Sequence, residues 1–272
     1  MFRSILTALK PSSTQAFVIE YSAALAQRLN AELNACIVFD ADQIAPREAV
    51  PPGAGAFKKS RDEQLTAEAR VAAEDAVRET LAAGLTAGIS CNAELNEGRV
   101  VDVLTRRAAE HDLLIVGHAL GDRGDESLLH QILKATSRPA IVFPKRSLSG
   151  SSVVVGYDGS RQAARALSSF VGSGLGIDRV VHVVSCHADT AEAQAICDVA
   201  CRFLGRHGLE AVSHPEELNR PPKTILLDWV DRGNAGLLVV GAYGHSSLRD
   251  LVFGSTTRTL LRELPLPVML DH

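Results

Sequence analysis

Short runs of apolar residues, rich in Val, Ile and Leu, alternate along the chain with longer segments whose apolar residues recur at helical spacing. Runs such as 237–240 contain no polar position, which is typical of parallel strands covered by helices on both faces. In the second half of the chain, the pattern predicts strands at 153–156, 180–185, 237–241 and 267–270, with a further strand near 210–213.

Between these strands the apolar positions follow a helical period, which predicts helices at 163–172, 190–207, 224–233 and 256–264. Strands and helices that alternate in this way build domains with a parallel sheet. The predicted fold class is therefore α/β, with doubly wound, mainly parallel, Rossmann-like sheets.

The chain contains an internal repeat. The hexapeptide DLLIVG at 112–117 recurs as GLLVVG at 236–241, and RPAIV at 138–142 recurs as LPVML at 266–270. A repeat of this length indicates two copies of one structural module.

The starts of the two copies also correspond, since the segment that begins at Ser4 aligns with the segment that begins at Ser152. A polar, Ser-rich stretch at 145–151 is typical of a linker. We therefore predict two tandem domains, 1–146 and 151–272.

The first copy contains a segment, 40–60, that is rich in Pro and Gly and has no regular period, which predicts an exposed loop. A long amphipathic helix is predicted to follow it at 62–85. Its apolar stripe consists of Leu65, Ala69, Ala72, Ala73, Ala76, Val77 and Leu81.

The composition is that of a globular chain: of 272 residues, 46% are hydrophobic and 22% charged. With 28 Lys and Arg against 32 Asp and Glu, the net charge of -4 argues against a nucleic-acid partner. No apolar run reaches the roughly 18–20 residues of a membrane span, and the first residues lack the apolar core of a secretory signal. We expect no membrane association and a cytoplasmic location.

The five cysteines are an odd number scattered over a long chain, so reduced thiols are expected. Cys197 and Cys201 lie four residues apart on a predicted helix. Together with His187 or His207 they offer an alternative interpretation as zinc ligands. The CxxC spacing of structural zinc sites is missing, and buried free cysteine is common. We therefore predict no metal site.

The most specific feature is a glycine-rich loop between a predicted buried strand and the helix at 256–264. It contains Gly241, Gly244 and Gly254, followed by Ser255 and Thr256. Glycines permit positive φ and leave no Cβ between backbone and ligand, while a helix start presents unpaired N–H groups. The loop predicts an anion site of the phosphate type. The alternative interpretation is a helix cap preceded by ordinary turns.

A second loop is expected at the same edge of the sheet, because the carboxyl ends of parallel strands meet there. Asp158 and Gly159 follow the first strand of the second copy. Asp158 is suited to accept hydrogen bonds from a ribose hydroxyl or to hold a metal near phosphates. Its alternative role is the N-cap of the following helix.

These residues resemble the universal stress protein family. The phosphate loop of its nucleotide-binding members is Gly, two residues, Gly, nine residues, then Gly with Ser or Thr. Gly241, Gly244, Gly254 and Ser255 match that spacing without a gap. The resemblance implies that the second copy binds ATP, alone or with Mg²⁺.

The family resemblance also assigns two further positions. It implies that Asp158 contacts the ribose and that a backbone group of Val183, in the family's second strand, contacts adenine. It covers the chain as a tandem pair, with family-specific motifs only in the second copy. It implies an intramolecular pseudo-dimer in which the last strands, near 140–143 and 268–270, pair antiparallel, and it leaves a homodimer open.

The first copy departs from the family pattern. Lys10 stands at the position of Asp158, so the carboxylate is lost. Glu126 falls at the position of Gly254, beside Asp122 and Asp125. Carboxylates repel a phosphate by on the order of 1–4 kcal/mol per charge pair at partly exposed distances. The first copy is therefore predicted not to bind a triphosphate.

Taken together, the sequence predicts a stress-response regulator or sensor that binds an adenine nucleotide in its second domain. It is predicted to act without a committed chemical step and through an unidentified protein partner. No activated nucleophile is recognised, and His245 in the loop reads as a solvated histidine rather than a general acid. Two alternatives stay open. One is a slow Mg²⁺-dependent ATPase or nucleotidyl transferase at the same site, and the other is a purely structural interaction protein.

Overall fold

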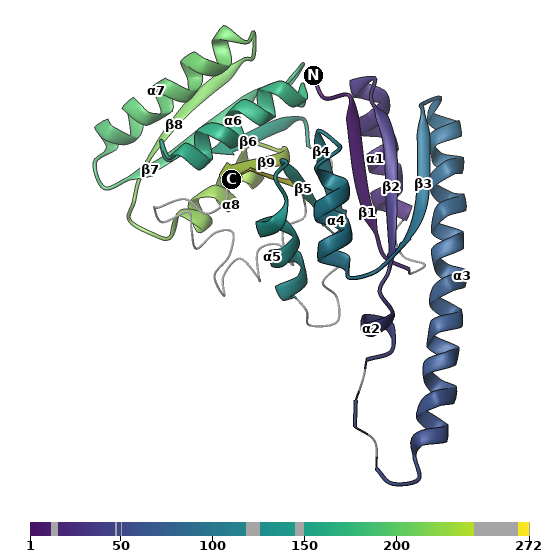
Figure 1. Cartoon of the computed structure of the whole chain (residues 1–272). Coiled ribbons are helices and arrows are strands. Elements are labelled where there is room, and N and C mark those ends of the chain that lie inside the picture. The colour runs from purple at the N-terminus through teal and green to yellow at the C-terminus, as the bar shows by residue number, and fades with distance from the viewer. Residues whose placement is uncertain are drawn as a thin grey trace. The chain divides into compact units, whose positions relative to one another are not determined.

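The computed structural model describes residues 1–11, 16–46, 48–49, 51–117, 126–144, 150–241 and 266–271 (Figure 1). The chain forms two compact units. The N-terminal unit comprises Arg3–Arg138, and the C-terminal unit comprises Pro139–His272 together with Met1–Phe2.

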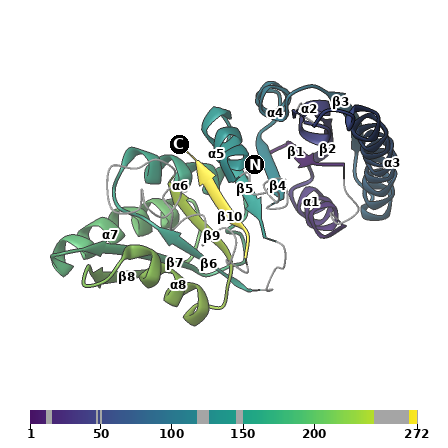
Figure 2. The same ribbon diagram turned by 90° about the horizontal axis from the view of Figure 1, so that it is seen from below.

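The N-terminal unit is built on a parallel sheet in the order β3-β2-β1-β4. The strands are β1 (Ser4–Leu9), β2 (Glu32–Phe39), β3 (Cys91–Glu97) and β4 (Leu113–Gly117). The helices are α1 (Ala16–Leu29), α2 (Ala41–Ile44), α3 (Gly55–Ala87), α4 (Val100–Ala108) and α5 (Glu126–Ala135). α1 and α4 lie on opposite faces of the sheet (Figure 2), so β1 and β4 are buried almost completely.

The long helix α3 differs from its prediction. The segment predicted as a loop contains the short helix α2, and α3 begins at Gly55 rather than near residue 62. Its first turns are held by polar contacts: Lys58 Nζ donates to the Pro46 carbonyl at 3.0 Å and to Asp62 at 2.5 Å. Because these turns contain no apolar stripe, hydrophobic periodicity gave no signal for them.

The predicted apolar stripe of α3 is also partly wrong. Leu81 is 41% exposed, whereas Thr80 and Gly84 are buried. A Cβ at Gly84 would lie 2.3 Å from the Cβ of Cys91 in β3, so the helix approaches the sheet through this glycine. Ala73 and Ala76 of the predicted stripe are buried, so the stripe is confirmed there and wrong at Leu81.

The C-terminal unit contains a sheet in the order β5-β10-β9-β6-β7-β8. Its strands are β5 (Ala140–Phe143), β6 (Ser152–Gly156), β7 (Val181–His187), β8 (Ala211–Glu217), β9 (Ala235–Gly241) and β10 (Val268–Asp271). α6 (Arg161–Ser173) and α7 (Thr190–Arg206) cover one face, and α8 (Pro222–Arg232) covers the other (Figure 2). The five strands predicted in the second half of the chain are confirmed. The helices predicted at 163–172, 190–207 and 224–233 are confirmed as α6, α7 and α8. The predicted helix at 256–264 lies outside the described residues.

The β5–β10 pair is antiparallel, in contrast to the parallel pairs β6–β7, β6–β9, β7–β8 and β9–β10. Val142 pairs with Val268 and Ala140 with Leu270. The predicted antiparallel pairing of these two strands is confirmed. β5 belongs by sequence to the first copy, yet it packs within the C-terminal unit.

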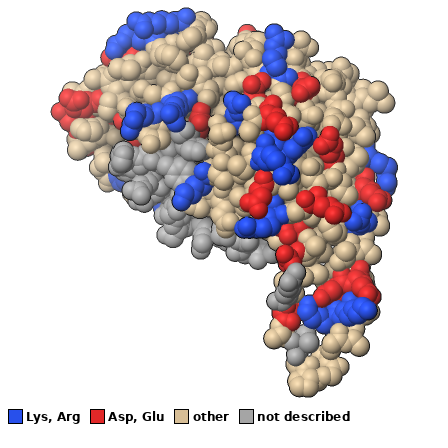
Figure 3. Space-filling model, viewed as in Figure 1, with Lys and Arg blue, Asp and Glu red and all other residues tan. Residues whose placement is uncertain are grey.

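Charged residues of both signs are mixed over the face of the N-terminal unit seen in Figure 3. Arg107 illustrates this mixing, since it contacts Glu94 and Glu110, each at 3.1 Å. The five cysteines are free thiols. Among the described helices, none is long and apolar enough to cross a membrane.

Candidate functional site

The candidate site begins where β6 ends and the chain turns into α6. The Tyr157 N–H donates to the Val184 carbonyl at 3.0 Å, so the chain leaves the sheet beside β7. Asp158 Oδ1 then accepts the Ser160 N–H at 3.0 Å, which closes a turn around Gly159. Gly159 has φ +76°, a left-handed conformation that favours glycine.

The N-cap of α6 is Ser160. Its Oγ accepts the Ala163 N–H at 3.1 Å, and its carbonyl accepts the Ala164 N–H at 2.9 Å. The alternative interpretation of Asp158 as the N-cap is therefore wrong, because Asp158 closes the preceding turn instead. A Ser directly before an amphipathic segment was the signal for this cap, and sequence reasoning overlooked it.

The first turn of α6 suits an anion. The opening N–H groups of a helix have no acceptor within the helix, and its dipole places partial positive charge there. The first turn of α6 contains no acidic residue, and Arg161 stands at its first position. The nearest carboxylate is that of Asp158, in the turn before the helix, so the first turn itself leaves room for an external anion.

Gly241, the last residue of β9, lies directly against that helix start. A Cβ on Gly241 would be 2.4 Å from the Ala163 nitrogen and 2.6 Å from the Gln162 carbonyl carbon. Its backbone is not in the left-handed region, so positive φ is not the reason for this glycine. Close packing of β9 on α6 is the reason, and it places the beginning of the glycine-rich loop at the N-terminus of α6.

Val183 lies within β7, one residue before the point where β6 ends. It is in register with Val155 of β6 and with Ser213 of β8, while Gly156 is in register with Val184. Its side chain is fully buried, and its carbonyl accepts the Cys197 thiol at 3.5 Å. Val183 is thus near the carboxyl edge of the sheet and held between two strands.

Several predicted residues lie outside the described part of the chain. These are Gly244, His245, Gly254, Ser255 and Thr256 of the loop, Asp122 and Asp125 of the first copy, and the side chain of Glu126. Most of the predicted linker, 145–151, lies outside it as well. The described residues that meet at the helix start are Asp158, Gly159, Ser160 and Gly241.

The corresponding position in the N-terminal unit has different neighbours. Gly117 ends β4 as Gly241 ends β9, but among the described residues the atom that a Cβ there would meet is Val18 Cγ2, at 3.1 Å. Lys10, the counterpart of Asp158, follows β1. The first copy therefore differs from the second in described residues as well as in its loop.

The cysteines offer no thiolate at this site. Burial raises the pKa of Cys186 and of Cys201 to about 11, and it raises the pKa of Cys197 as well. A thiol of raised pKa is a weak nucleophile at neutral pH. Within the described residues, no three metal-binding side chains gather into one group, around Cys197 or elsewhere.

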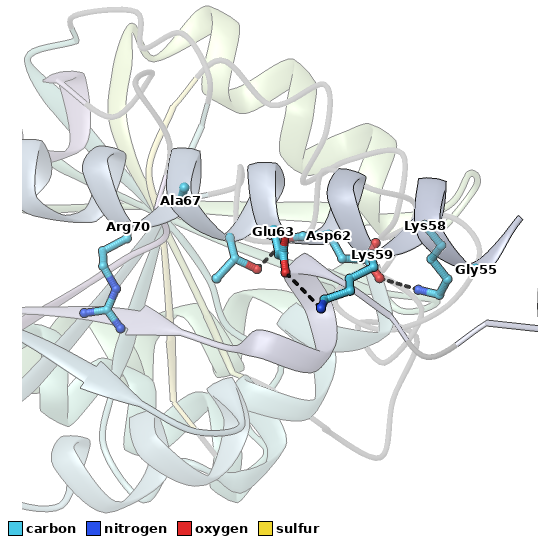
Figure 4. Close-up of a pocket in the computed structure, with 8 residues that line it drawn as sticks. Gly55, Lys58, Lys59, Asp62, Glu63, Ala67 and Arg70 are labelled. Carbon is cyan, nitrogen blue, oxygen red and sulfur yellow. Dashed lines mark hydrogen bonds and ion pairs between the residues drawn. The ribbon is translucent and has the colours of Figure 1, made fainter.

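A separate hollow of about 580 Å³ follows one side of α3 in the N-terminal unit (Figure 4). Its basic side chains have acidic neighbours: Lys58 contacts Asp62 at 2.5 Å, and Lys59 contacts Glu63 at 3.8 Å. These pairs cancel most of the local charge. The hollow is therefore less suited to an anion than the start of α6.

The C-terminal unit thus has the architecture of doubly wound α/β domains, which bind ligands beyond the carboxyl ends of their strands. Residues 151–272 match the family model described as the universal stress protein family. This part of the chain is therefore similar to the universal stress protein family.

Similar proteins agree with this assignment. Universal stress protein Slr1230 of Synechocystis sp. (strain ATCC 27184 / PCC 6803 / Kazusa) is 29% identical over 188 residues. The match covers 63% of this chain and 62% of that protein, so the chain spans less than two thirds of this curated relative.

Two solved structures share the fold over nearly the whole chain. A universal stress protein from Archaeoglobus fulgidus DSM 4304 has a TM-score of 0.70 at 18% identity and covers 98% of this chain and 95% of its own. The functionally unknown protein PA1789 from Pseudomonas aeruginosa PAO1 has a TM-score of 0.60 at 16% identity, with coverages of 99% and 92%. At these identities the likeness concerns the fold alone.

Proposed function

We propose that the C-terminal unit binds ATP or a related adenine nucleotide at the N-terminal end of α6. The observation that carries the proposal is the packing of Gly241 against Gln162 and Ala163. This packing starts the motif Gly241-x₂-Gly244-x₉-Gly254-Ser255 beside the first turn of α6, where the helix dipole places partial positive charge and the Ala163 N–H is capped by Ser160 Oγ.

The proposal gives each residue a role. The loop amides at Gly244 and Gly254 and the hydroxyls of Ser255 and Thr256 hold the phosphates. Asp158 accepts from the ribose, and a backbone group of Val183 contacts adenine.

Mg²⁺ fits the same edge as a companion of the phosphates. Asp158 is a carboxylate at that edge, and Mg²⁺ prefers oxygen ligands from one or two carboxylates and from substrate phosphates. Asp158 Oδ1 already accepts the Ser160 N–H, which orients the carboxylate. When bound, Mg²⁺ neutralises phosphate charge.

The proposal restricts binding to the second copy. In the first copy, the counterpart of Asp158 is Lys10 and the counterpart of Gly254 is Glu126, so ribose acceptor and phosphate cradle are both replaced. The N-terminal unit then serves assembly rather than binding. A cytoplasmic location, a homodimer and an unidentified protein partner stay predictions.

Regulation rather than turnover is the proposed use of the nucleotide. General-base catalysis needs a side chain within hydrogen-bond reach of the attacking water. Two acids lie at this edge among the described residues: Asp158, which the proposal engages with ribose or metal, and Asp271, which is in register with Gly241 and accepts from Ser169 of α6. This favours a sensor over the ATPase and nucleotidyl transferase alternatives.

The experiment is mass spectrometry of small molecules released when the purified protein is denatured. An adenine nucleotide is expected from the wild type and from Asp178→Asn, a control at the opposite edge of the sheet, with less from Asp158→Asn. Nucleotide absent from the wild type, and not rebound when ATP is added, would contradict the proposal. A rate constant for ATP cleavage of about 10 per second in a single-turnover experiment with Mg²⁺, and its loss in Asp158→Asn, would favour an enzyme.

A further inference from the structure

A cluster of aromatic side chains ties α8 to the outer strands of the C-terminal sheet. His182 of β7 and His214 of β8 are diagonal neighbours on one face, with 3.0 Å between His182 Nδ1 and His214 Nε2. The ring of Trp229 in α8 lies on His214 with 3.8 Å between centroids. Trp229 Nε1 donates to Glu216 Oε1 at 2.7 Å, which fixes the indole.

The two imidazoles can share only one proton between their facing nitrogens. An N–H···N bond needs one donor and one lone pair, so either Nδ1 of His182 or Nε2 of His214 must be bare. One extra proton on the pair preserves the bond. A second turns both nitrogens into donors, removes the bond and sets two cations against each other, with 5.1 Å between ring centroids.

The packing leaves His182 little room to move away from a second charge. Gly233 is the C-cap of α8, and a Cβ there would be 3.1 Å from His182 Cδ2 and 2.9 Å from the Trp229 carbonyl oxygen. Backbone of α8 therefore lies directly against one edge of this imidazole. Repulsion within the pair is relieved most readily by displacement of α8.

The other charged and titratable groups that face the pair differ in their effect on its protonation. Glu216 of β8 raises the pKa of His214, but burial and the charge of His182 outweigh it and lower that pKa below the ordinary 6.5. Arg232 of α8 lies over Trp229 at 5.9 Å and adds positive charge. On β7 the Cys186 thiol, whose pKa burial raises to about 11, is neutral.

An ion pair lies close by and is already neutralised. Arg220 contacts Asp228 of α8 at 2.5 Å, so neither side chain is available to compensate a second proton on the pair. Glu216 is the one carboxylate that faces the cluster among the described residues, and it is engaged by Trp229.

We propose that His182 and His214 form an acid-responsive latch. At neutral pH their hydrogen bond fixes the His214 ring on which Trp229 of α8 packs, and double protonation breaks the bond and loosens α8. The latch is independent of the nucleotide proposal, since it uses none of that site's residues.

Trp229 is the only tryptophan in the chain, so its fluorescence reports directly on the latch. We expect a loss of intensity and a shift of the emission maximum to longer wavelength between about pH 8 and about pH 5. The midpoint should lie below 6.5, the ordinary His value. His214→Gln, which cannot take up the proton, should abolish the transition. His187→Gln, which removes an exposed histidine outside the cluster, should preserve it.

Amide exchange provides the second measurement. Corrected for its intrinsic pH dependence, exchange in α8 should accelerate on acidification relative to α7, and His214→Gln should remove that acceleration. Circular dichroism at each pH confirms that the variants are folded. Trp229 emission that does not change with pH, together with unchanged amide exchange in α8 of the wild type, would overturn the latch. The same fluorescence transition in His214→Gln would overturn it as well.

Discussion

Gly117 and Gly241 occupy the same position in the two copies, at the last residue of the strand that runs beside β1 or β6. Their surroundings differ among the described residues, because backbone of α6 lies against Gly241, whereas a methyl group of Val18 lies near Gly117. At the scale of one residue, this contrast separates the copy with the candidate site from the copy without it.

The contrast predicts different costs for the same substitution. Gly241→Ala should lower the free energy of unfolding of the C-terminal unit by about 1–3 kcal/mol, because the new Cβ overlaps backbone atoms that cannot rotate away. Gly117→Ala should cost less than about 1 kcal/mol, because the Val18 side chain can yield. Urea unfolding checks both variants. Equal losses would contradict the packing role of Gly241.

His111 gives a pH-dependent prediction. It is 6% exposed, its Nδ1 contacts Ser4 Oγ, and its Nε2 is buried without a hydrogen-bond partner among the described residues. Burial, reinforced by the charge of Arg107, lowers the pKa of His111 below 6.5. The unfolded chain then binds the proton more readily. This contribution to stability is therefore complete above pH 6.5 and is lost as the pH falls below it.

The measurement is urea unfolding of wild type and His111→Gln above and below that pH. The slope of stability against pH should be smaller in the variant, by at most about 1.4 kcal/mol per pH unit. A slope that is the same in both proteins would show that His111 titrates alike in the folded and unfolded chain.

The helix α3 shows what hydrophobic pattern can predict about an element and what it cannot. Its second half packs on the sheet, so a helix was predictable there. Its first half is held by Lys58 through Pro46 and Asp62, and such polar contacts depend on where the chain returns in space. The strands of both sheets were predictable because they are buried on both faces and leave continuous apolar runs in the sequence.

Two glycines inside helices provide a matched test of how these elements pack. Gly84 of α3 faces Cys91, whose Cβ would be 2.3 Å from a new Cβ, whereas nothing lies within 4 Å of such an atom on Gly205 of α7. Gly84→Ala should therefore destabilise by about 1–3 kcal/mol. Gly205→Ala should stabilise by about 0.5–1 kcal/mol, as alanine does in an open helical position. Thermal unfolding measures both. A stabilised Gly84→Ala would contradict the observed face of α3.

The β5–β10 pair predicts slow amide exchange at the end of the chain. Val142 with Val268 and Ala140 with Leu270 are buried and in register, so their backbone groups should be protected. Exchange followed by mass spectrometry should show protection of both strands comparable to that of β9. Rapid exchange in either strand alone would rule out the pairing.

The whole molecule contains two copies of one architecture, with strand order β3-β2-β1-β4 in the first and β8-β7-β6-β9-β10 in the second. Repeated motifs made this duplication predictable, and the spacing of Gly241, Gly244 and Gly254 is the basis for the prediction that the second copy binds nucleotide. The packing reason for Gly241 and the His182–His214 pair were not predictable, because both depend on contacts between elements distant in sequence. Both came from three-dimensional packing alone.

Isothermal titration calorimetry with ATP and Mg²⁺ tests the central claim most directly. The wild type should bind one nucleotide per chain, and Gly254→Val should bind none, because its branched side chain occupies the space of a phosphate oxygen. Glu126→Val, the same substitution at the corresponding position of the first copy, should leave both stoichiometry and affinity unchanged. Two equivalent sites per chain, or undiminished affinity in Gly254→Val, would contradict nucleotide binding in the second copy alone.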